Sequence, residues 1–339
     1  MSKPNYLALL LLAVTGIVPV AAAPIGVVWR LPLQGPVSWD YLTFDQAHRR
    51  LFVSRGVRVD IIDVDHKTKV GQIDGTAGAH GITLAPALHR GYVSDGLINA
   101  VTVFDLNTFK VIATITGLGE KPDAIVYDSA SKHVLTFNGK GHSFSVIDPA
   151  RNVLIQTVPL PGKPEFAQAD GNGHVYANLE DRSSLVEIDS RADRVLHVWP
   201  LPGCDSPSGL ALDRTRHRLF SVCDNEHMAV TNALDGSHVA TVDIGKGPDA
   251  VVYDPSRQMV YSSNGQSGNI TAIRQHDADH YEVSASIPSQ LSARTLALDS
   301  QHQQLYLSAA TIDANKHGEG RSFLPDSFTL IAVGIAARP

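Results

Sequence analysis

The sequence lacks the motifs that mark many common activities. It has no Ser nucleophile elbow, no glycine-rich phosphate loop and no Cys-x-x-Cys-His haem attachment site. It has no run of basic residues, and its formal net charge of −6 disfavours a polyanionic partner such as nucleic acid. After residue 23, no stretch approaches the ~20 apolar residues that a membrane helix needs. These absences exclude a later membrane-spanning helix and the enzyme classes that those motifs define.

Long amphipathic helices are also missing, and short β-branched or aromatic runs take their place. The stretch from Gly81 to Glu120 shows the pattern, with four such runs at 81–84, 91–94, 100–104 and 109–115. Each run ends in turn residues, which is typical of consecutive antiparallel strands. Four strands of this size cannot bury both of their faces, so the unit needs copies of itself.

The chain supplies these copies at a period close to 42 residues. About nine residues after its first turn, each copy closes its second strand with an aromatic-small-small-polar signature, as in Tyr92–Asp95 and Tyr261–Asn264. The first hairpin turn of each copy opens at Asp45, Ala85, Asp128, Asp170, Asp213, Asp254 and Asp299. Seven copies of four strands predict an all-β fold, a seven-bladed β-propeller with four antiparallel strands per blade.

One exported domain is the predicted organisation. An apolar run from Tyr6 to Ala23 ends in small residues, which predicts a signal peptide over 1–22 and a periplasmic or secreted bacterial protein. Residues 23–339 then form the single propeller, with blades at about 38–78, 79–120, 121–162, 163–204, 205–247, 248–290 and 291–334. The last copy lacks a fourth strand, so we expect residues 26–31 to supply it and to close the ring.

The two cysteines form the only possible pair, and export leads to an oxidising compartment. Cys204 is expected to end the outer strand of the fourth blade, and Cys223 to end the second strand of the fifth. The first and second strands of the fifth blade pair with each other, so the two sulfurs should lie near each other. We predict a disulfide that links two blades. Free thiols, or a metal site that also uses His227 or Asp224, are the alternatives.

The repeat Tyr92-Val-Ser-Asp95, followed by Val101–Asp105 and Val111–Ile115, resembles the YVTN β-propeller repeat family, whose nearest members are exported bacterial YncE-like proteins. The similarity covers essentially the whole mature chain. It implies binding rather than turnover, and it implies single-stranded DNA binding as one possibility. The motif's Asn is retained at Asn138, Asn178 and Asn264, whereas Arg55, Asp95, Cys223 and Ala309 stand in its place elsewhere.

Polar residues are predicted to converge where the inner strands enter the central channel. Alignment of the copies by their hairpin turns places one residue per blade at this entry: Asp40, His80, Asp123, Glu165, Ser208, Asp249 and Arg294. The loops around them contribute Arg55, Asp95, Asn138, Asn178, Asp224 and Asn264. Carboxylates with amide oxygens predict a pocket for a small polar ligand or for a hard divalent cation such as Ca²⁺. The alternative is a solvated polar rim without a ligand.

Residues 310–326 form the one long insertion, between the second and third strands of the last blade. Loops of this length are often lids or binding loops. Lys316, His317, Glu319 and Arg321 would lie above the channel mouth, and Phe323 with Leu324 would pack the loop down. The alternative is a flexible, tolerated insertion.

Together these features predict a monomeric binding module, not an enzyme, for an unknown protein or small polar ligand. The main alternative is a metal-assisted hydrolase of the lactonase-propeller kind. It would hold a divalent cation with some of Asp123, Glu165, Asp249 and nearby Asn residues, and His80 or His317 would accept the proton. Single-stranded DNA binding is a second alternative, and it requires exposed aromatic residues beside a positive groove.

Overall fold

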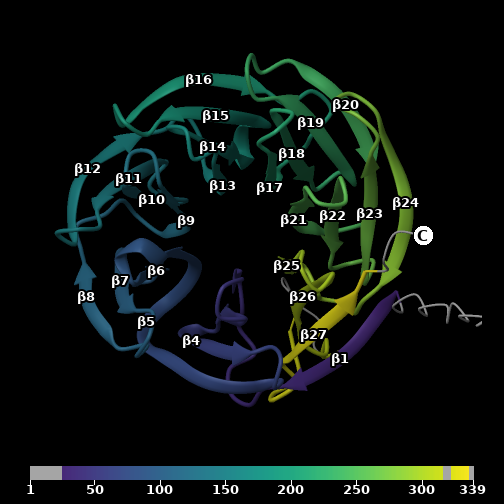
Figure 1. The fold of residues 1–339 in the computed structure, drawn as a ribbon, viewed down its shortest axis with the longest axis horizontal. Coiled ribbons are helices and arrows are strands. Elements are labelled where there is room, and N and C mark those ends of the chain that lie inside the picture. The colour runs from purple at the N-terminus through teal and green to yellow at the C-terminus, as the bar shows by residue number, and fades with distance from the viewer. Residues whose placement is uncertain (1–24, 316–321, 336–339) are drawn as a thin grey trace, which may run out of the picture.

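The computed structural model of the chain describes residues 25–315 and 322–335. Its strands form antiparallel sheets that stand in a ring around a central axis (Figure 1). The predicted signal peptide lies outside the described residues. Within them, no helix has the length and apolar character needed to cross a membrane.

The described residues form five four-stranded sheets and one seven-stranded sheet. Four of the four-stranded sheets follow one another along the chain: β9 (Pro122–Asp128), β10 (His133–Asn138), β11 (Ser143–Asp148) and β12 (Val153–Pro159); β13 (Pro164–Ala169), β14 (His174–Leu179), β15 (Ser184–Asp189) and β16 (Arg194–Pro200); β17 (Pro207–Asp213), β18 (Arg218–Cys223), β19 (His227–Asn232) and β20 (His238–Asp243); and β21 (Pro248–Asp254), β22 (Met259–Asn264), β23 (Asn269–Gln275) and β24 (Tyr281–Pro288). In each of them the first strand lies nearest the axis and the fourth lies outermost (Figure 1).

The seven-stranded sheet precedes these four. It contains β2 (Leu42–Asp45), β3 (Arg50–Ser54), β4 (Gly56–Asp63), β5 (Thr68–Ala85), β6 (Arg90–Asp95), β7 (Ala100–Asp105) and β8 (Val111–Ile115). Strand β5 is 18 residues long; Ile73 in its first half pairs with β4, and Ile82 in its second half pairs with β6. One continuous strand therefore joins two units that the sequence had divided at residue 78.

The last sheet combines the two ends of the described chain. Its order is β1 (Gly26–Pro32), β27 (Thr329–Gly334), β26 (Gln304–Ala309) and β25 (Thr295–Asp299). Strand β1 pairs antiparallel with β27 from Gly26 opposite Gly334 to Pro32 opposite Thr329. It lies outermost in this sheet (Figure 1), which agrees with the pairing predicted for residues 26–31.

Local chemistry explains why the repeat produces these hairpins. In six of the seven copies an Asp opens the first turn, and its carboxylate accepts backbone N–H groups two to four residues later. Asp45 accepts from Ala47 at 3.1 Å, and Asp213 accepts from Thr215 at 3.0 Å. This side-chain bond replaces a backbone bond and stabilises the turn. The middle strands, such as β10, are buried and carry the apolar runs, whereas the outermost strands, such as β12, are largely exposed.

Candidate functional site

One cavity of about 270 Å³ collects all seven residues that the sequence predicted at the inner-strand entries. They are Asp40, His80, Asp123, Glu165, Ser208, Asp249 and Arg294. Five of them lie on the strands nearest the axis, and the other two lie just before β2 and β25. Because every copy shares one register, equivalent positions meet around the axis. We call this space the mouth cavity.

His80 holds two carboxylates of the mouth cavity together. Its Nδ1 lies 2.6 Å from Oδ2 of Asp40 and 3.7 Å from Oδ1 of Asp123. Burial opposes the charged imidazole, but the hydrogen bond to Asp40 and the negative charge of Asp123 together raise the pKa of His80.

The Asp123 side chain is 8% exposed, and Lys121 Nζ lies 3.8 Å away. Burial, followed by the charge of Asp40, raises the pKa of Asp123.

The other two carboxylates have close cationic partners. Lys163 Nζ lies 2.7 Å from Glu165, and Arg294 Nε lies 2.9 Å from Asp249. Burial still raises the pKa of Glu165, and the charge of Asp123 adds to this effect. Burial also raises the pKa of Asp249 to about 7, against the opposing effect of Arg294. Of the four cavity carboxylates, Asp123 is therefore the one without a cation within 3.5 Å among the described residues.

Two aromatic residues complete the mouth cavity. Tyr41 precedes β2 and Phe166 lies on β13, and their rings stack with centroids 4.6 Å apart. Burial, followed by the charge of Asp123, raises the pKa of Tyr41 well above its ordinary value, so its hydroxyl stays protonated. Sequence reasoning missed both residues. Tyr41 directly follows Asp40, and Phe166 directly follows Glu165. Their place next to predicted entry residues is the sequence feature that could have identified them.

Three residues of the mouth cavity form a group that could hold a metal ion. Asp40, His80 and Asp123 each offer one ligand atom, and these atoms all lie within 4.8 Å of one another. Two carboxylate oxygens with an imidazole nitrogen fit divalent transition metals better than the all-oxygen Ca²⁺ set expected from the sequence. The predicted co-ligands Glu165 and Asp249 are instead engaged by Lys163 and Arg294.

The three motif asparagines do not line the mouth cavity, which corrects their predicted position. All three are fully buried. Asn138 donates to two serine hydroxyls of β11, and Asn264 donates to Asn269 and Thr271 of β23. Asn178 donates to the carbonyl of Ser208 in the next sheet at 2.9 Å. These amides satisfy buried polar groups within and between sheets.

Two other loop positions are also structural. Arg55 is buried, pairs with Asp60 at 3.0 Å and lies over the Phe328 ring at 3.7 Å. Asp95 is buried and accepts a hydrogen bond from Thr102 at 2.6 Å.

The long insertion is described at both of its ends. Phe323 packs on Trp39, with ring centroids 4.9 Å apart, as expected for a residue that holds the loop down, whereas Leu324 is exposed. The predicted ligand-binding residue His317 lies outside the described residues, together with the rest of 316–321.

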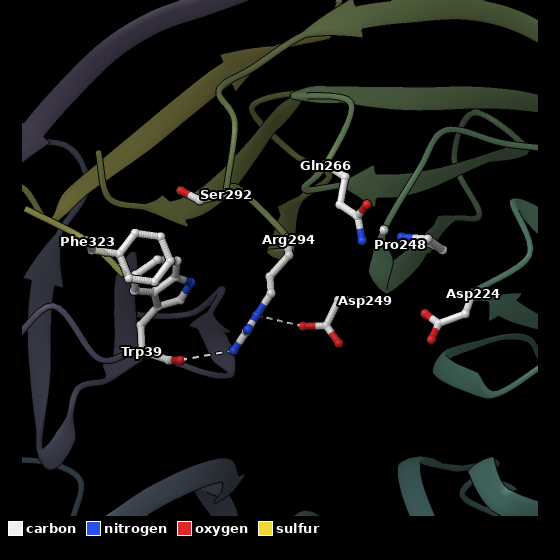
Figure 2. A pocket seen from close by; sticks show the side chains of 9 residues that line it. Trp39, Asp224, Pro248, Asp249, Gln266, Ser292, Arg294 and Phe323 are labelled. Atoms are coloured by element: carbon white, nitrogen blue, oxygen red, sulfur yellow. Dashed lines mark hydrogen bonds and ion pairs between the residues drawn. The ribbon is translucent and has the colours of Figure 1, made fainter. Parts of the chain in front are cut away.

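A second cavity of about 360 Å³ adjoins the first, and we call it the side cavity (Figure 2). It is lined by Trp39, Asp224, Gly247, Pro248, Asp249, Gln266, Ser292, Arg294 and Phe323. Asp249 and Arg294 line both cavities. The Arg294 guanidinium also donates to the Trp39 carbonyl at 3.3 Å. This side chain therefore stands at the boundary between the two spaces.

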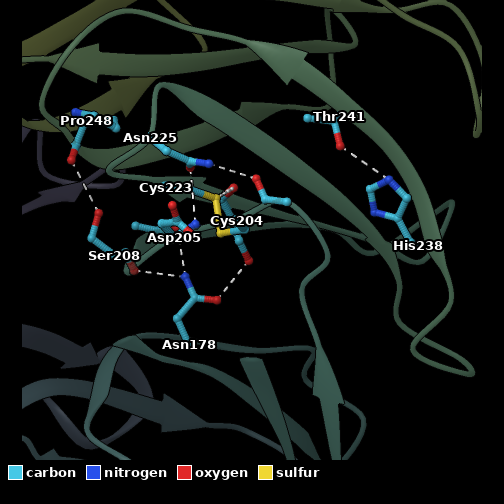
Figure 3. The surroundings of a disulfide bond; sticks show 12 residues. Asn178, Cys204, Asp205, Ser208, Cys223, Asn225, His238, Thr241 and Pro248 are labelled. Atoms are coloured by element: carbon cyan, nitrogen blue, oxygen red, sulfur yellow. Dashed lines mark hydrogen bonds between the residues drawn. A yellow bond between two sulfur atoms is a disulfide. The ribbon is translucent and has the colours of Figure 1, made fainter. Parts of the chain in front are cut away.

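Cys204 and Cys223 form a disulfide beside both cavities (Figure 3). Their Cα atoms are 5.3 Å apart, and both side chains are buried. Cys223 directly precedes Asp224 of the side cavity, and Cys204 precedes Ser208 of the mouth cavity by four residues. The bond therefore anchors segments that carry residues of both cavities.

A ring of four-stranded antiparallel sheets places the chain among the β-propellers. The chain is 24% identical over 308 residues to an uncharacterized protein named YncE from Salmonella typhi, a match that covers 86% of this chain and 73% of the relative. YncE from Salmonella typhimurium matches equally well. These matches confirm the resemblance to YncE-like proteins. No protein-family model matches the chain.

Solved structures support the propeller architecture. The WD40 repeats of RRP9 superimpose with a TM-score of 0.77 at 12% identity, covering 92% of this chain and 99% of that one. A chain of the mitotic checkpoint complex superimposes with a TM-score of 0.76 at 14% identity, covering 98% of this chain and 99% of that one. At these identities the likeness concerns the fold alone.

Proposed function

We propose that the chain is an exported, seven-bladed β-propeller that acts as a binding module, with the mouth cavity as its ligand site. The count of seven takes the seven-stranded sheet as two blades joined through β5, since the two halves of that strand pair with different partners. The signal-like segment 1–22 supports export. The observation that carries the proposal is the convergence of one polar residue from each of the seven repeats on a single cavity.

The mouth cavity suits a small cationic ligand, and a divalent cation is the simplest candidate. Asp123 is a buried carboxylate whose nearest cationic groups, His80 and Lys121, lie 3.7 and 3.8 Å away, farther than the partners of Glu165 and Asp249. Asp40 and His80 lie within coordinating reach of a shared ion. A bound cation would give Asp123 a closer positive partner than His80 or Lys121.

Calorimetric titration with Mn²⁺, Zn²⁺ and Ca²⁺ tests this proposal, together with thermal melting in chelator. At a hundredfold excess over its Kd, a specific cation stabilises the fold by about 2.7 kcal/mol. Asp123→Asn should weaken binding at least tenfold, whereas Asp243→Asn, at an exposed position on β20, should not change it. Absence of binding by all three cations, or equal binding by Asp123→Asn, would refute the cation site.

Metal-assisted hydrolysis is the second candidate, and the Asp40–His80–Asp123 group favours it. A bound divalent cation would polarise a carbonyl. Glu165, whose pKa burial raises, lies in the same cavity and would be the proton carrier. Hydrolysis of a lactone panel that needs added metal and is lost in Asp123→Asn would support this function.

A protein ligand on the same face is a further form of the proposal, since one structural neighbour is part of the mitotic checkpoint complex. Single-stranded DNA is disfavoured on charge. The mouth cavity carries four carboxylates but only Lys121 and Arg294 as permanent cations, whereas a nucleic-acid groove is positive.

A further inference from the structure

The side cavity carries a net negative charge. Two carboxylates, Asp224 and Asp249, and one guanidinium, Arg294, line it. Arg294 already pairs with Asp249 at 2.9 Å. The exposed Asp224 carboxylate has no hydrogen bond or ion pair within the part of the chain that the structure describes, and in Figure 2 it points toward Asp249 across the cavity. When both carboxylates are ionised, the cavity is therefore one positive charge short of neutrality.

A hydrogen-bond donor without a partner lies at the opposite end of the side cavity. Trp39 is 6% exposed, and its indole N–H has no acceptor among the described residues. A buried donor left without an acceptor is unfavourable, and a ligand carbonyl that reached it would satisfy it. Figure 2 shows Trp39 and Phe323 together at this end, with Arg294 and Asp249 between them and Asp224. Acidic and aromatic groups thus lie at separate ends of one space.

We propose that the side cavity binds a small molecule that carries a protonated amine, a carbonyl oxygen and a flat apolar side chain. The amine would lie toward Asp224 and the side-chain amide of Gln266, which faces the cavity in Figure 2. The carbonyl oxygen would accept a hydrogen bond from the indole N–H of Trp39, and the apolar group would pack near Phe323. Amino acid derivatives and the N-terminal residue of a peptide both have these three groups. At about 360 Å³ the cavity has the size of known small-molecule sites.

This inference does not depend on a ligand in the mouth cavity, because it uses none of Asp40, His80 and Asp123. Phenylalaninamide is the probe, since it carries all three groups. Two analogues each lack one of them: 2-phenylethylamine lacks the carbonyl, and 3-phenylpropionamide lacks the amine. We expect calorimetry at pH 7.5 to show phenylalaninamide binding at least tenfold more tightly than 3-phenylpropionamide. Equal binding of these two compounds, or no binding of phenylalaninamide, would overturn the proposal.

Variants locate the site. Asp224→Asn, at an exposed position, should weaken the binding of phenylalaninamide at least tenfold. The matched change Asp243→Asn, also at an exposed position, should leave this binding unchanged. Trp39→Phe keeps an aromatic ring, although a smaller one, and removes the indole N–H donor, so it should weaken the binding of phenylalaninamide more than that of 2-phenylethylamine. Asp123→Asn should change the affinity for phenylalaninamide far less than Asp224→Asn does, which separates this site from the mouth cavity. Full binding by Asp224→Asn would overturn the assignment.

The source of the ligand follows from two more probes. The tripeptide Phe-Ala-Ala amide presents the same groups as a peptide N-terminus, and its N-acetylated form lacks the charge. Tighter binding of the free tripeptide than of phenylalaninamide would identify a peptide N-terminus, and weaker binding would identify a free amino acid derivative. The proposal requires that acetylation abolish binding, and an acetylated peptide that binds equally well would contradict it.

Discussion

The buried carboxylate of Asp95 should make the stability of the protein fall as pH rises. Asp95 is fully buried; its Oδ2 accepts from Thr102 at 2.6 Å, and its Oδ1 has no partner among the described residues. Burial raises the pKa of Asp95 from 3.8 to about 7, and the hydrogen bonds from Thr102 only partly oppose this. The folded state therefore holds a proton that the unfolded state releases near pH 4.

The sign and size of the effect follow from linkage. A folded pKa above the unfolded pKa contributes stability at low pH, and this contribution is lost as pH rises through about 7. At 1.36 kcal/mol per pKa unit, the wild type should lose about 2.5 kcal/mol of unfolding free energy between pH 5 and pH 8 through this group. Asp95→Asn cannot ionise, so it should not suffer this loss.

Urea unfolding at half-unit pH steps from 5 to 8 measures the effect. Other titrating groups are common to both proteins, so the difference between wild type and Asp95→Asn isolates Asp95. The variant should gain on the wild type up to about pH 7, and the difference should level off above it. Asp243→Asn, which removes an exposed carboxylate, should run parallel to the wild type. A difference between wild type and Asp95→Asn that stays constant within about 0.5 kcal/mol would refute the reasoning.

Three further predictions concern the framework. Replacing both Cys204 and Cys223 with Ser opens a loop with a sequence separation of 19 residues and should lower the unfolding free energy by about 3 kcal/mol; wild type in reductant should match the variant, and an unchanged urea midpoint would contradict this. Arg55→Ala removes a buried cation from Asp60 and Phe328 and should cost about 3 kcal/mol or more in urea unfolding; a cost below 1 kcal/mol would show that Arg58 and Lys69 suffice for Asp60. Deletion of residues 1–32 removes β1 and exposes the edge of β27, so light scattering should detect self-association. A monomer with an unchanged melting temperature would argue that β1 does not protect this edge.

The repeat allowed the mouth cavity to be predicted because register is a local property. Six of the seven copies open the first turn with the same Asp side-chain bond, and the copy at Ala85 keeps the same spacing without it, so residues at one offset from that turn reach one height on the axis. Asp40, His80 and Asp123 could therefore be grouped from sequence, although 83 positions separate the first from the last. The disulfide followed from the same register, because Cys223 ends a strand whose neighbour begins just after Cys204.

Contacts between sheets were beyond this reasoning. Asn178 has the offset of a loop ligand, but its amide bonds across to Ser208 of the next sheet, and no local pattern encodes that partner. Likewise, the pairing of Asp249 with Arg294 depends on how two neighbouring units pack. The repeat spacing placed a boundary between two blades at residue 78. The backbone instead continues through it as β5, since both edges of that strand find partners.

The pairing of β1 with β27 has a consequence for the timing of assembly. About 300 residues separate Gly26 from Gly334, so this contact is among the most non-local in the chain. Such contacts form slowly because a long loop must close first. A chain that emerges N-terminus first would hold β1 without its partner until nearly everything else has appeared. We therefore expect completion of the last sheet to limit the rate of maturation, and we expect chaperone protection to matter most during that interval.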